Sequence, residues 1–178
     1  MVKQSDIVLC NIPFMSVAYA PAGTSLLKAC LQEKGFICTV KDYNIKLWDS
    51  LSDKKIIDDL ENYFTVNTTL DTDTQVLVDQ YYELIVSELV KLNPKWIGFS
   101  VFTFQCQRAT TEILQRLRSR YKGKIMIGGA GISTRGIASS NADYGDKLMK
   151  EGLIDAFIKG DGDIALVELL KGNFKFAG

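Results

Sequence analysis

The sequence predicts a doubly wound α/β domain of the flavodoxin-like (Rossmann-like) kind, built on a five-stranded parallel sheet in the order 2-1-3-4-5. Five short apolar runs occur along the 178 residues. They are almost continuously apolar rather than alternating, which is typical of strands buried on both faces. Helix-like patterns separate the runs. This alternation, with right-handed crossovers, places helices on both faces of a parallel sheet.

The predicted strands cover residues 7–10, 36–40, 96–101, 124–128 and 154–158. Each run has the usual length of a strand and ends at small or polar residues that indicate a loop. The length of the chain, 178 residues, fits a single core of ordinary size. We therefore expect one domain over residues 1–178.

Two apolar stripes at helical spacing predict helices between these strands. The first helix begins near Thr24 and ends at Gly35, with an apolar face between them. A second helix carries Ala109, Ile113 and Leu117 at intervals of four residues. Side chains four apart lie on one face of a helix, so this face is expected to pack on the sheet.

The segment between the second and third strands departs from this simple alternation. Over residues 43–93 there are two helical patterns, separated by a polar break at residues 65–74. We interpret this segment as a helical insertion that packs over the sheet or its upper rim. Its Tyr and Phe side chains are expected to belong to the core rather than to contact a ligand.

The composition excludes several classes of partner. Lys plus Arg and Asp plus Glu both number 21, so no overall field of either sign attracts nucleic acid or an acidic membrane surface. No apolar run approaches the roughly 20 residues that span a bilayer. The sequence therefore predicts a cytoplasmic protein that binds neither nucleic acid nor membrane.

The chain carries few residues of its own for catalysis. It has no histidine, which removes the commonest general base and the commonest zinc ligand. Cys10, Cys30, Cys38 and Cys106 share no metal-ligand spacing, and three of them lie in or beside apolar segments typical of buried thiols. We expect no catalytic or metal-ligating residues, so any chemistry would come from a bound cofactor.

The predicted strand order reverses between strands one and three, so a ligand should lie outside their carboxyl ends. The loop after the first strand is long, apolar and rich in turn residues, which suits a large ligand with a hydrophobic face, although an ordinary structured loop is equally compatible. The residues of this loop that we expect to contact the ligand are Pro13, Phe14, Ala20, Pro21 and Gly23.

The loops after strands three and four bring further candidates. The first offers hydroxyl and aromatic groups in Ser100, Phe102, Thr103 and Phe104; Thr103 could alternatively cap the following helix. The second contains Gly128, Gly129, Ala130 and Gly131. Absent side chains allow backbone to approach a ligand closely or to adopt positive φ. We expect Gly129→Val to block ligand binding while leaving the fold largely intact.

The loop after the fifth strand contains Gly160, Asp161, Gly162 and Asp163. With the residues that follow, it matches G-x-G-x-x-A between a strand and a helix, a pattern found in dinucleotide-binding sites. Two aspartates would repel a pyrophosphate, and the unit is the last rather than the first of the sheet. We therefore expect these carboxylates to accept hydrogen bonds from hydroxyls or neutral amides, or else to cap the final helix.

Together these segments resemble the cobalamin-binding domain at the amino end of class B radical S-adenosylmethionine (SAM) enzymes. The resemblance covers nearly the whole chain and is carried by residues 7–14, 19–23, 97–102, 127–131 and 158–163. In that family the last segment usually reads Gly-Glu-Gly-Glu, where this chain has aspartates. Of the wider B12-binding fold, the S-x-L and G-G motifs are matched at residues 100–102 and 128–129. The histidine loop is absent.

The resemblance implies that the chain binds cobalamin base-off, with no histidine ligand to cobalt. It implies the cofactor domain of a cobalamin-dependent radical SAM enzyme such as a methyltransferase. In that family a downstream barrel domain holds the 4Fe-4S cluster and S-adenosylmethionine through a C-x-x-x-C-x-x-C motif, which this chain lacks. We therefore expect an amino-terminal fragment or a short relative, inactive alone, that works with a radical SAM barrel in cis or in trans.

Two other classes of function remain open at this stage. One is a flavodoxin-like binding or signalling module for a flavin or a nucleotide. A receiver domain would need a phosphorylatable aspartate after strand three, where this chain has Ser100, Phe102 and Thr103. The other is a scaffold domain that has lost its ligand and only contacts a partner.

Overall fold

A computed structural model of the protein describes residues 4–18, 22–66, 68–132 and 143–173. All strands of its sheet are parallel, and they lie in the order β2-β1-β3-β4-β5, which confirms the predicted topology. The strands are β1 (Ile7–Asn11), β2 (Cys38–Asp42), β3 (Trp96–Ser100), β4 (Lys124–Gly128) and β5 (Ala156–Ile158). The predicted bounds agree within two residues, and the largest differences occur at both ends of β2 and at the start of β5.

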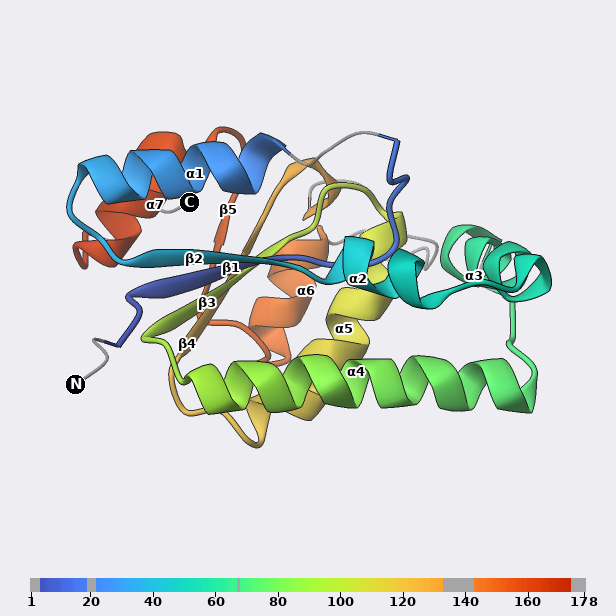
Figure 1. Ribbon diagram of the computed structural model, residues 1–178. Coiled ribbons are helices and arrows are strands. Elements are labelled where there is room, and N and C mark those ends of the chain that lie inside the picture. The colour runs from blue at the N-terminus through green and yellow to red at the C-terminus, as the bar shows by residue number, and fades with distance from the viewer. Residues whose placement is uncertain (1–3, 19–21, 67, 133–142, 174–178) are drawn as a thin grey trace.

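Helices cover both faces of the sheet, as Figure 1 shows. One face carries α1 (Ala22–Glu33) and α7 (Gly162–Leu170), which also contact each other. The other face carries α4 (Thr72–Leu92), α5 (Gln105–Arg118) and α6 (Tyr144–Lys150). The doubly wound architecture is therefore confirmed.

The alternation of side chains along the strands divides the apolar interior into two clusters. Val8 and Cys10 of β1 belong to the larger cluster, together with α4, α5 and α6. Ile7 and Leu9 point to the opposite face and belong to the smaller cluster, together with α1 and α7. Because neighbouring side chains of a strand point to opposite faces, one buried strand contributes to both clusters.

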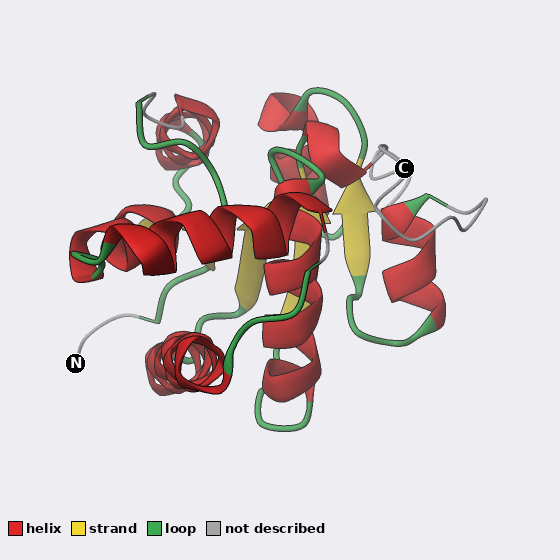
Figure 2. Cartoon of the chain, turned by 90° about the vertical axis from the view of Figure 1, so that its right-hand side faces the viewer, coloured by secondary structure: helices red, strands yellow, loops and turns green. Residues whose placement is uncertain are grey.

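The insertion contains three helices rather than the two that the sequence predicted. The additional helix is α2 (Tyr43–Ser50), which follows β2 directly; the Asp42 side chain accepts a hydrogen bond from the Ile45 backbone N–H at 2.9 Å and caps it. The next helix, α3 (Lys54–Val66), lies beyond the carboxyl ends of the strands and crosses in front of them in Figure 2. It is followed by α4.

The aromatic residues of the insertion belong to the core, as predicted. Tyr43, Tyr63, Phe64 and Tyr82 are all at most 3% exposed. Within the described ranges, no helix has both the length and the apolarity needed to cross a membrane.

Candidate binding site at the carboxyl ends of the strands

A cavity of about 370 Å³ opens between the sheet and the helices α1 and α7, at the carboxyl ends of the strands. Its walls come from the strands, from the first turns of both helices and from the loops after β3, β4 and β5. The size falls in the range of about 300–1,000 Å³ that is usual for small-molecule sites. It is lined by Leu9, Gly23, Thr24, Leu26, Leu27, Gly98, Phe99, Ser100, Phe102, Met126, Gly128, Gly129, Ala130, Ile158, Gly160, Asp161, Gly162, Asp163 and Leu166.

The floor of the cavity is apolar and comes from the middle of the strands. Leu9, Gly98 and Met126 are neighbours in the parallel register of β1, β3 and β4. A Cβ on Gly98 would lie 2.8 Å from Leu9 Cδ2 and 2.9 Å from Met126 Sδ. The glycine therefore lets the two neighbouring side chains meet over β3, where any larger residue would displace them.

Polar groups stand one row nearer to the mouth. Asn11, Ser100 and Gly128 are in register at the ends of β1, β3 and β4. Asn11 is buried; its Nδ2 donates to Asp42 Oδ2 at 2.9 Å, while its Oδ1 has no hydrogen-bond partner within the described part of the chain. Of these three residues, Ser100 and Gly128 line the cavity, so the Ser100 hydroxyl is the polar side-chain group that this row presents to it.

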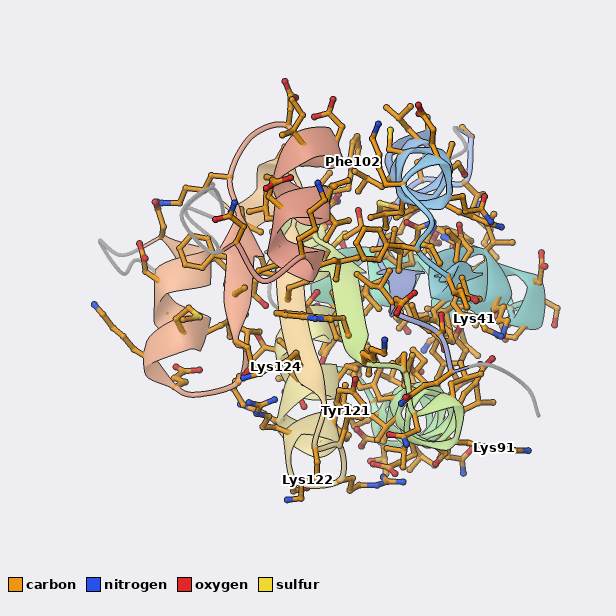
Figure 3. All side chains as sticks on the ribbon, turned by 90° about the vertical axis from the view of Figure 1, so that its left-hand side faces the viewer. Lys41, Lys91, Phe102, Tyr121, Lys122 and Lys124 are labelled. Atoms are coloured by element: carbon orange, nitrogen blue, oxygen red, sulfur yellow. The ribbon has the colours of Figure 1, made fainter. Side chains whose placement is uncertain are left out.

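The mouth of the cavity combines exposed apolar side chains with carboxylates. Leu26 and Phe102 line it and are 61% and 59% exposed, and Ile164, beside Asp163, is 71% exposed. Phe102 lies between α1 and α7 in Figure 3. Among the described lining residues there is no Lys or Arg, so Asp161 and Asp163 supply the only charged side chains. Such a rim favours a broad neutral ligand with hydrogen-bond donors over an anion.

The two glycines after β4, Gly129 and Gly131, allow the loops after β3 and β4 to approach each other closely. A Cβ on Gly129 would meet the Val101 carbonyl oxygen at 2.7 Å, and one on Gly131 would meet the Thr103 carbonyl oxygen at 2.5 Å. Gly129 also has a φ of +106°, a conformation that favours glycine. The expectation that Gly129→Val leaves the fold intact is therefore wrong, because the loops after β3 and β4 approach each other too closely there.

Gly128 is different, because it has room for a side chain. The nearest atom to a Cβ added at Gly128 is the Ile158 carbonyl oxygen at 3.7 Å, an ordinary contact distance. Gly128 shares its strand face with Met126, two residues earlier, and both line the cavity. Gly128, unlike Gly129, therefore borders open space at the cavity wall.

The part of the loop after β1 that holds Phe14 and Met15 packs against the insertion. Phe14 is only 4% exposed, and its ring lies 5.1 Å from that of Phe64 and 4.8 Å from that of Trp48. Asn44 of α2 holds the next residue through two hydrogen bonds: its Oδ1 accepts from the Met15 N–H at 2.9 Å, and its Nδ2 donates to the Met15 carbonyl at 3.0 Å. Pro13 is buried in the same loop, so neither Pro13 nor Phe14 reaches the cavity wall.

Neither α5 nor α7 has a hydrogen bond from the side chain of its N-cap residue. Phe104 holds the N-cap position of α5, with no side-chain hydrogen bond, and the Thr103 hydroxyl lies 3.4 Å from Gln105 Oε1. Asp161 holds the N-cap position of α7, and its carboxylate caps no N–H. The Asp163 carboxylate accepts from the Ile164 N–H at 2.9 Å. The exposed carboxylate of Asp161 thus faces the mouth without a structural role in its helix.

The predicted site residues fall into three groups. Those that line the cavity are Gly23, Ser100, Phe102, Gly128, Gly129, Ala130, Gly160, Asp161, Gly162 and Asp163. Those that do not line it are Pro13, Phe14, Thr103, Phe104 and Gly131. Ala20 and Pro21 lie outside the described residues.

The lining residues that come from inside strands and helices were not predicted from the sequence. These are Leu9, Thr24, Leu26, Leu27, Gly98, Phe99, Met126, Ile158 and Leu166. A signal for some of them was present, because side chains two residues before a site loop point to the same face as the strand end. Applied to Ser100 and Gly128, this rule leads to Gly98 and Met126.

Three of the four cysteines are buried, and they are divided between the two apolar clusters. Cys10 and Cys106 are buried in the larger cluster, whereas Cys38 is buried in the smaller one. Burial raises the pKa of all three thiols, that of Cys38 to about 11. Within the described ranges, no group of three or more His, Cys, Asp or Glu residues is arranged to hold a metal ion.

Comparisons by sequence find no relatives. No protein-family model matches the chain. The curated proteins contain no match either.

Solved structures, in contrast, share the fold over nearly the whole chain. The radical S-adenosylmethionine methyltransferase TsrM from Kitasatospora setae, with cobalamin and a [4Fe-4S] cluster bound, has a TM-score of 0.55 at 19% identity, covering 98% of this chain and 26% of its own. TsrM with tryptophan and a SAM analogue bound matches equally well, covering 97% of this chain. Apo OxsB, a cobalamin-dependent S-adenosylmethionine radical enzyme, has a TM-score of 0.57 at 17% identity, covering 99% of this chain and 19% of its own.

At such low identity the likeness establishes the fold. The chain spans about a quarter or less of the length of these structures. Its neighbours in fold are cobalamin and radical SAM enzymes, the class that its loop motifs resemble.

Proposed function

We propose that the protein is a cobalamin-binding domain and that the cavity between the sheet and the helices α1 and α7 receives the nucleotide tail of the cofactor. The observation that carries the proposal is the position of this cavity: it opens where the strand order reverses, in a fold shared with a structure that holds cobalamin. The apolar floor of Leu9, Gly98 and Met126 suits a flat, uncharged base.

The rim suits the corrin ring of the same cofactor. A corrin is a broad, mostly neutral disc whose edge carries amides. Leu26 and Phe102 would lie against its apolar surface, and the carboxylates of Asp161 and Asp163 would accept hydrogen bonds from the amide N–H groups. Pro13 and Phe14, which the sequence suggested for this task, are occupied in the insertion core.

The cobalt would have no histidine ligand from this chain, because the sequence contains none. With the base in the cavity, it cannot also bind cobalt, so the cofactor would be base-off. Cobalamin would supply a cobalt centre able to carry a methyl group. The iron–sulfur cluster and S-adenosylmethionine would belong to a radical SAM barrel domain, in cis or in trans, and the reaction would be a methyl transfer or a related step.

The alternative of a flavin- or nucleotide-binding module is disfavoured by charge. Flavin mononucleotide and free nucleotides end in phosphate groups that carry nearly two negative charges or more, and such groups are held by cations or unblocked helix N-termini; the phosphodiester of the cobalamin tail carries only one. The described lining residues bring two carboxylates and no cation, and one of these carboxylates stands at the start of α7.

Titration with hydroxocobalamin tests the proposal. We expect saturable binding at one site per chain, followed by absorbance, while flavin mononucleotide does not bind. After reduction to cob(II)alamin, electron paramagnetic resonance should show no superhyperfine splitting from an axial nitrogen. Failure to bind any corrinoid would reject the function, whereas binding with a nitrogen splitting would reject only the base-off state.

A further inference from the structure

Thr24 is a buried polar residue for which the fold gives no explanation. It lies in the first turn of α1, is 3% exposed and lines the cavity, and its hydroxyl has no hydrogen-bond partner within the described part of the chain. The two threonines of α5 show the usual solution: Thr110 donates to the Cys106 carbonyl at 2.7 Å and Thr111 to the Gln107 carbonyl at 3.0 Å. An unpaired buried hydroxyl costs stability, so a ligand that pairs it gains affinity.

The surroundings of Thr24 define the chemistry of that ligand group. Leu9, Leu27 and Leu166 line the same cavity, which disfavours a charged group. Ser100 contributes a second hydroxyl from the end of β3. The matching group is therefore flat and uncharged and carries a heteroatom at its edge, which describes a nitrogen heteroaromatic base.

We propose that the Thr24 hydroxyl forms a hydrogen bond with a ring nitrogen of the lower base of a bound cobamide, and that it thereby selects among cobamides with different bases. This inference rests on the proposed function. In the base-off state the ring nitrogen that otherwise binds cobalt is free to accept from a hydroxyl. A cobamide whose lower base is replaced by a phenol such as p-cresol has no ring nitrogen there and would leave the Thr24 hydroxyl unpaired.

The test compares three corrinoids that differ only in the tail. Cobalamin carries a benzimidazole base, p-cresolyl cobamide carries a base without ring nitrogen, and cobinamide lacks the nucleotide tail. Thr24→Val replaces the hydroxyl by a methyl group of similar size. We expect it to weaken cobalamin binding about tenfold, the size of one hydrogen bond, and to change the other two affinities by less than about twofold.

Two controls accompany this variant. Ser25→Ala removes an exposed hydroxyl from the adjacent position of α1 and should leave all three affinities unchanged. Thr24→Ser keeps the hydroxyl and should retain the preference for cobalamin, whereas Thr24→Ala should lose it. Circular dichroism establishes that each variant is folded.

The outcomes separate this inference from the function on which it rests. If Thr24→Val and Thr24→Ala leave cobalamin affinity unchanged, or weaken all three corrinoids equally, the assignment of Thr24 is overturned. If the unmodified protein binds cobalamin and p-cresolyl cobamide equally well, the selection is overturned too. If it binds none of the three, the proposed function itself fails.

Discussion

Gly128 and Gly129 are adjacent in the chain, but a side chain added to each would meet different surroundings. At Gly129 it would run into the Val101 carbonyl oxygen, and the positive φ adds strain. At Gly128 it would extend into the cavity without a close contact. The pair therefore separates the effect of filling the cavity from the effect of disturbing the loop.

We predict that Gly128→Val weakens ligand binding strongly while the fold is kept. Cobalamin affinity should fall at least tenfold, because the added methyl groups occupy space at the cavity wall, and the free energy of unfolding should change by less than about 1 kcal/mol. Gly129→Val should lower the free energy of unfolding by more than about 2 kcal/mol. Cobalamin titration and urea denaturation measure the two effects. Unchanged affinity in folded Gly128→Val would contradict the position of the site.

The sequence located the loops of the site but not the residues beneath them. An apolar run such as residues 96–101 predicts a buried strand, yet it does not say which face lacks a covering side chain. Gly98 can be recognised as part of the cavity floor only when its neighbours in the sheet, Leu9 and Met126, are known. Phe14 was assigned to the ligand because the sequence cannot show that Phe64, 50 positions away, stacks on it.

At the scale of whole elements, the carboxyl and amino ends of the strands differ in how they are covered. The cavity opens at the carboxyl ends, whereas at the amino ends Asp155, which precedes β5, links neighbouring elements through hydrogen bonds. Its carboxylate accepts hydrogen bonds from the Ile125 N–H at 2.9 Å, from Arg118 at 3.1 Å and from Lys124 at 3.0 Å. Lys124 lies at the edge that faces the viewer in Figure 3. One side chain thus joins β4, α5 and the start of β5.

The ionisation of Asp155 predicts a pH dependence of stability. Burial alone would raise its pKa, but the hydrogen bonds from Ile125, Lys124 and Arg118 outweigh burial and hold the pKa below the ordinary value. A depressed pKa in the folded state means that the carboxylate stabilises the fold fully above the unfolded value of about 4, and that this contribution is lost as the pH falls through the folded pKa.

We therefore expect Asp155→Asn to lower the free energy of unfolding by about 1 kcal/mol at pH 7 and by progressively less below about pH 4. Urea denaturation at intervals of about half a pH unit, between about pH 2.5 and 7, measures this difference in the free energy of unfolding. Asp58→Asn is the matched control, because Asp58 is exposed on α3 and should have little effect at any pH. A constant difference between Asp155→Asn and the unmodified protein across this range would contradict the assignment.

The elements themselves were largely predictable, with one exception. Continuous apolar runs separated by helical patterns were sufficient for five parallel strands, and their order was that of the flavodoxin-like fold to which such an alternation points. The helix α2 was missed because its eight residues follow β2 without a break and are too few for a clear apolar stripe. Its boundary depends on the Asp42 cap, which becomes apparent only when the strand end is known.

At the scale of the whole molecule, the two faces of the sheet are unequal. The face toward α4, α5 and α6 is filled by large buried side chains. The face toward α1 and α7 has fewer of them and leaves the cavity near the carboxyl edge. Around its mouth Leu26, Phe102 and Ile164 remain exposed. A cofactor whose tail entered the cavity and whose ring covered these side chains would complete the smaller core.

The arrangement of the cysteines leads to a prediction about the chain as a whole. An iron–sulfur cluster is held by thiolates that converge on one site. Cys10 lies in β1 within the larger cluster and Cys38 in β2 within the smaller one, so the sheet separates them. Burial also raises the pKa of both thiols, which keeps them protonated at neutral pH.

We therefore predict that this 178-residue chain alone neither assembles a stoichiometric [4Fe-4S] cluster nor cleaves S-adenosylmethionine, even when loaded with cobalamin and given a strong reductant. Anaerobic reconstitution with iron and sulfide, Mössbauer spectroscopy and an assay for 5′-deoxyadenosine measure both. Adding a radical SAM barrel domain in trans should restore cleavage if the chain serves as its cofactor domain. A cluster with product formation from the chain alone would require thiols from opposite sides of the sheet to meet, which this fold does not allow without opening its core.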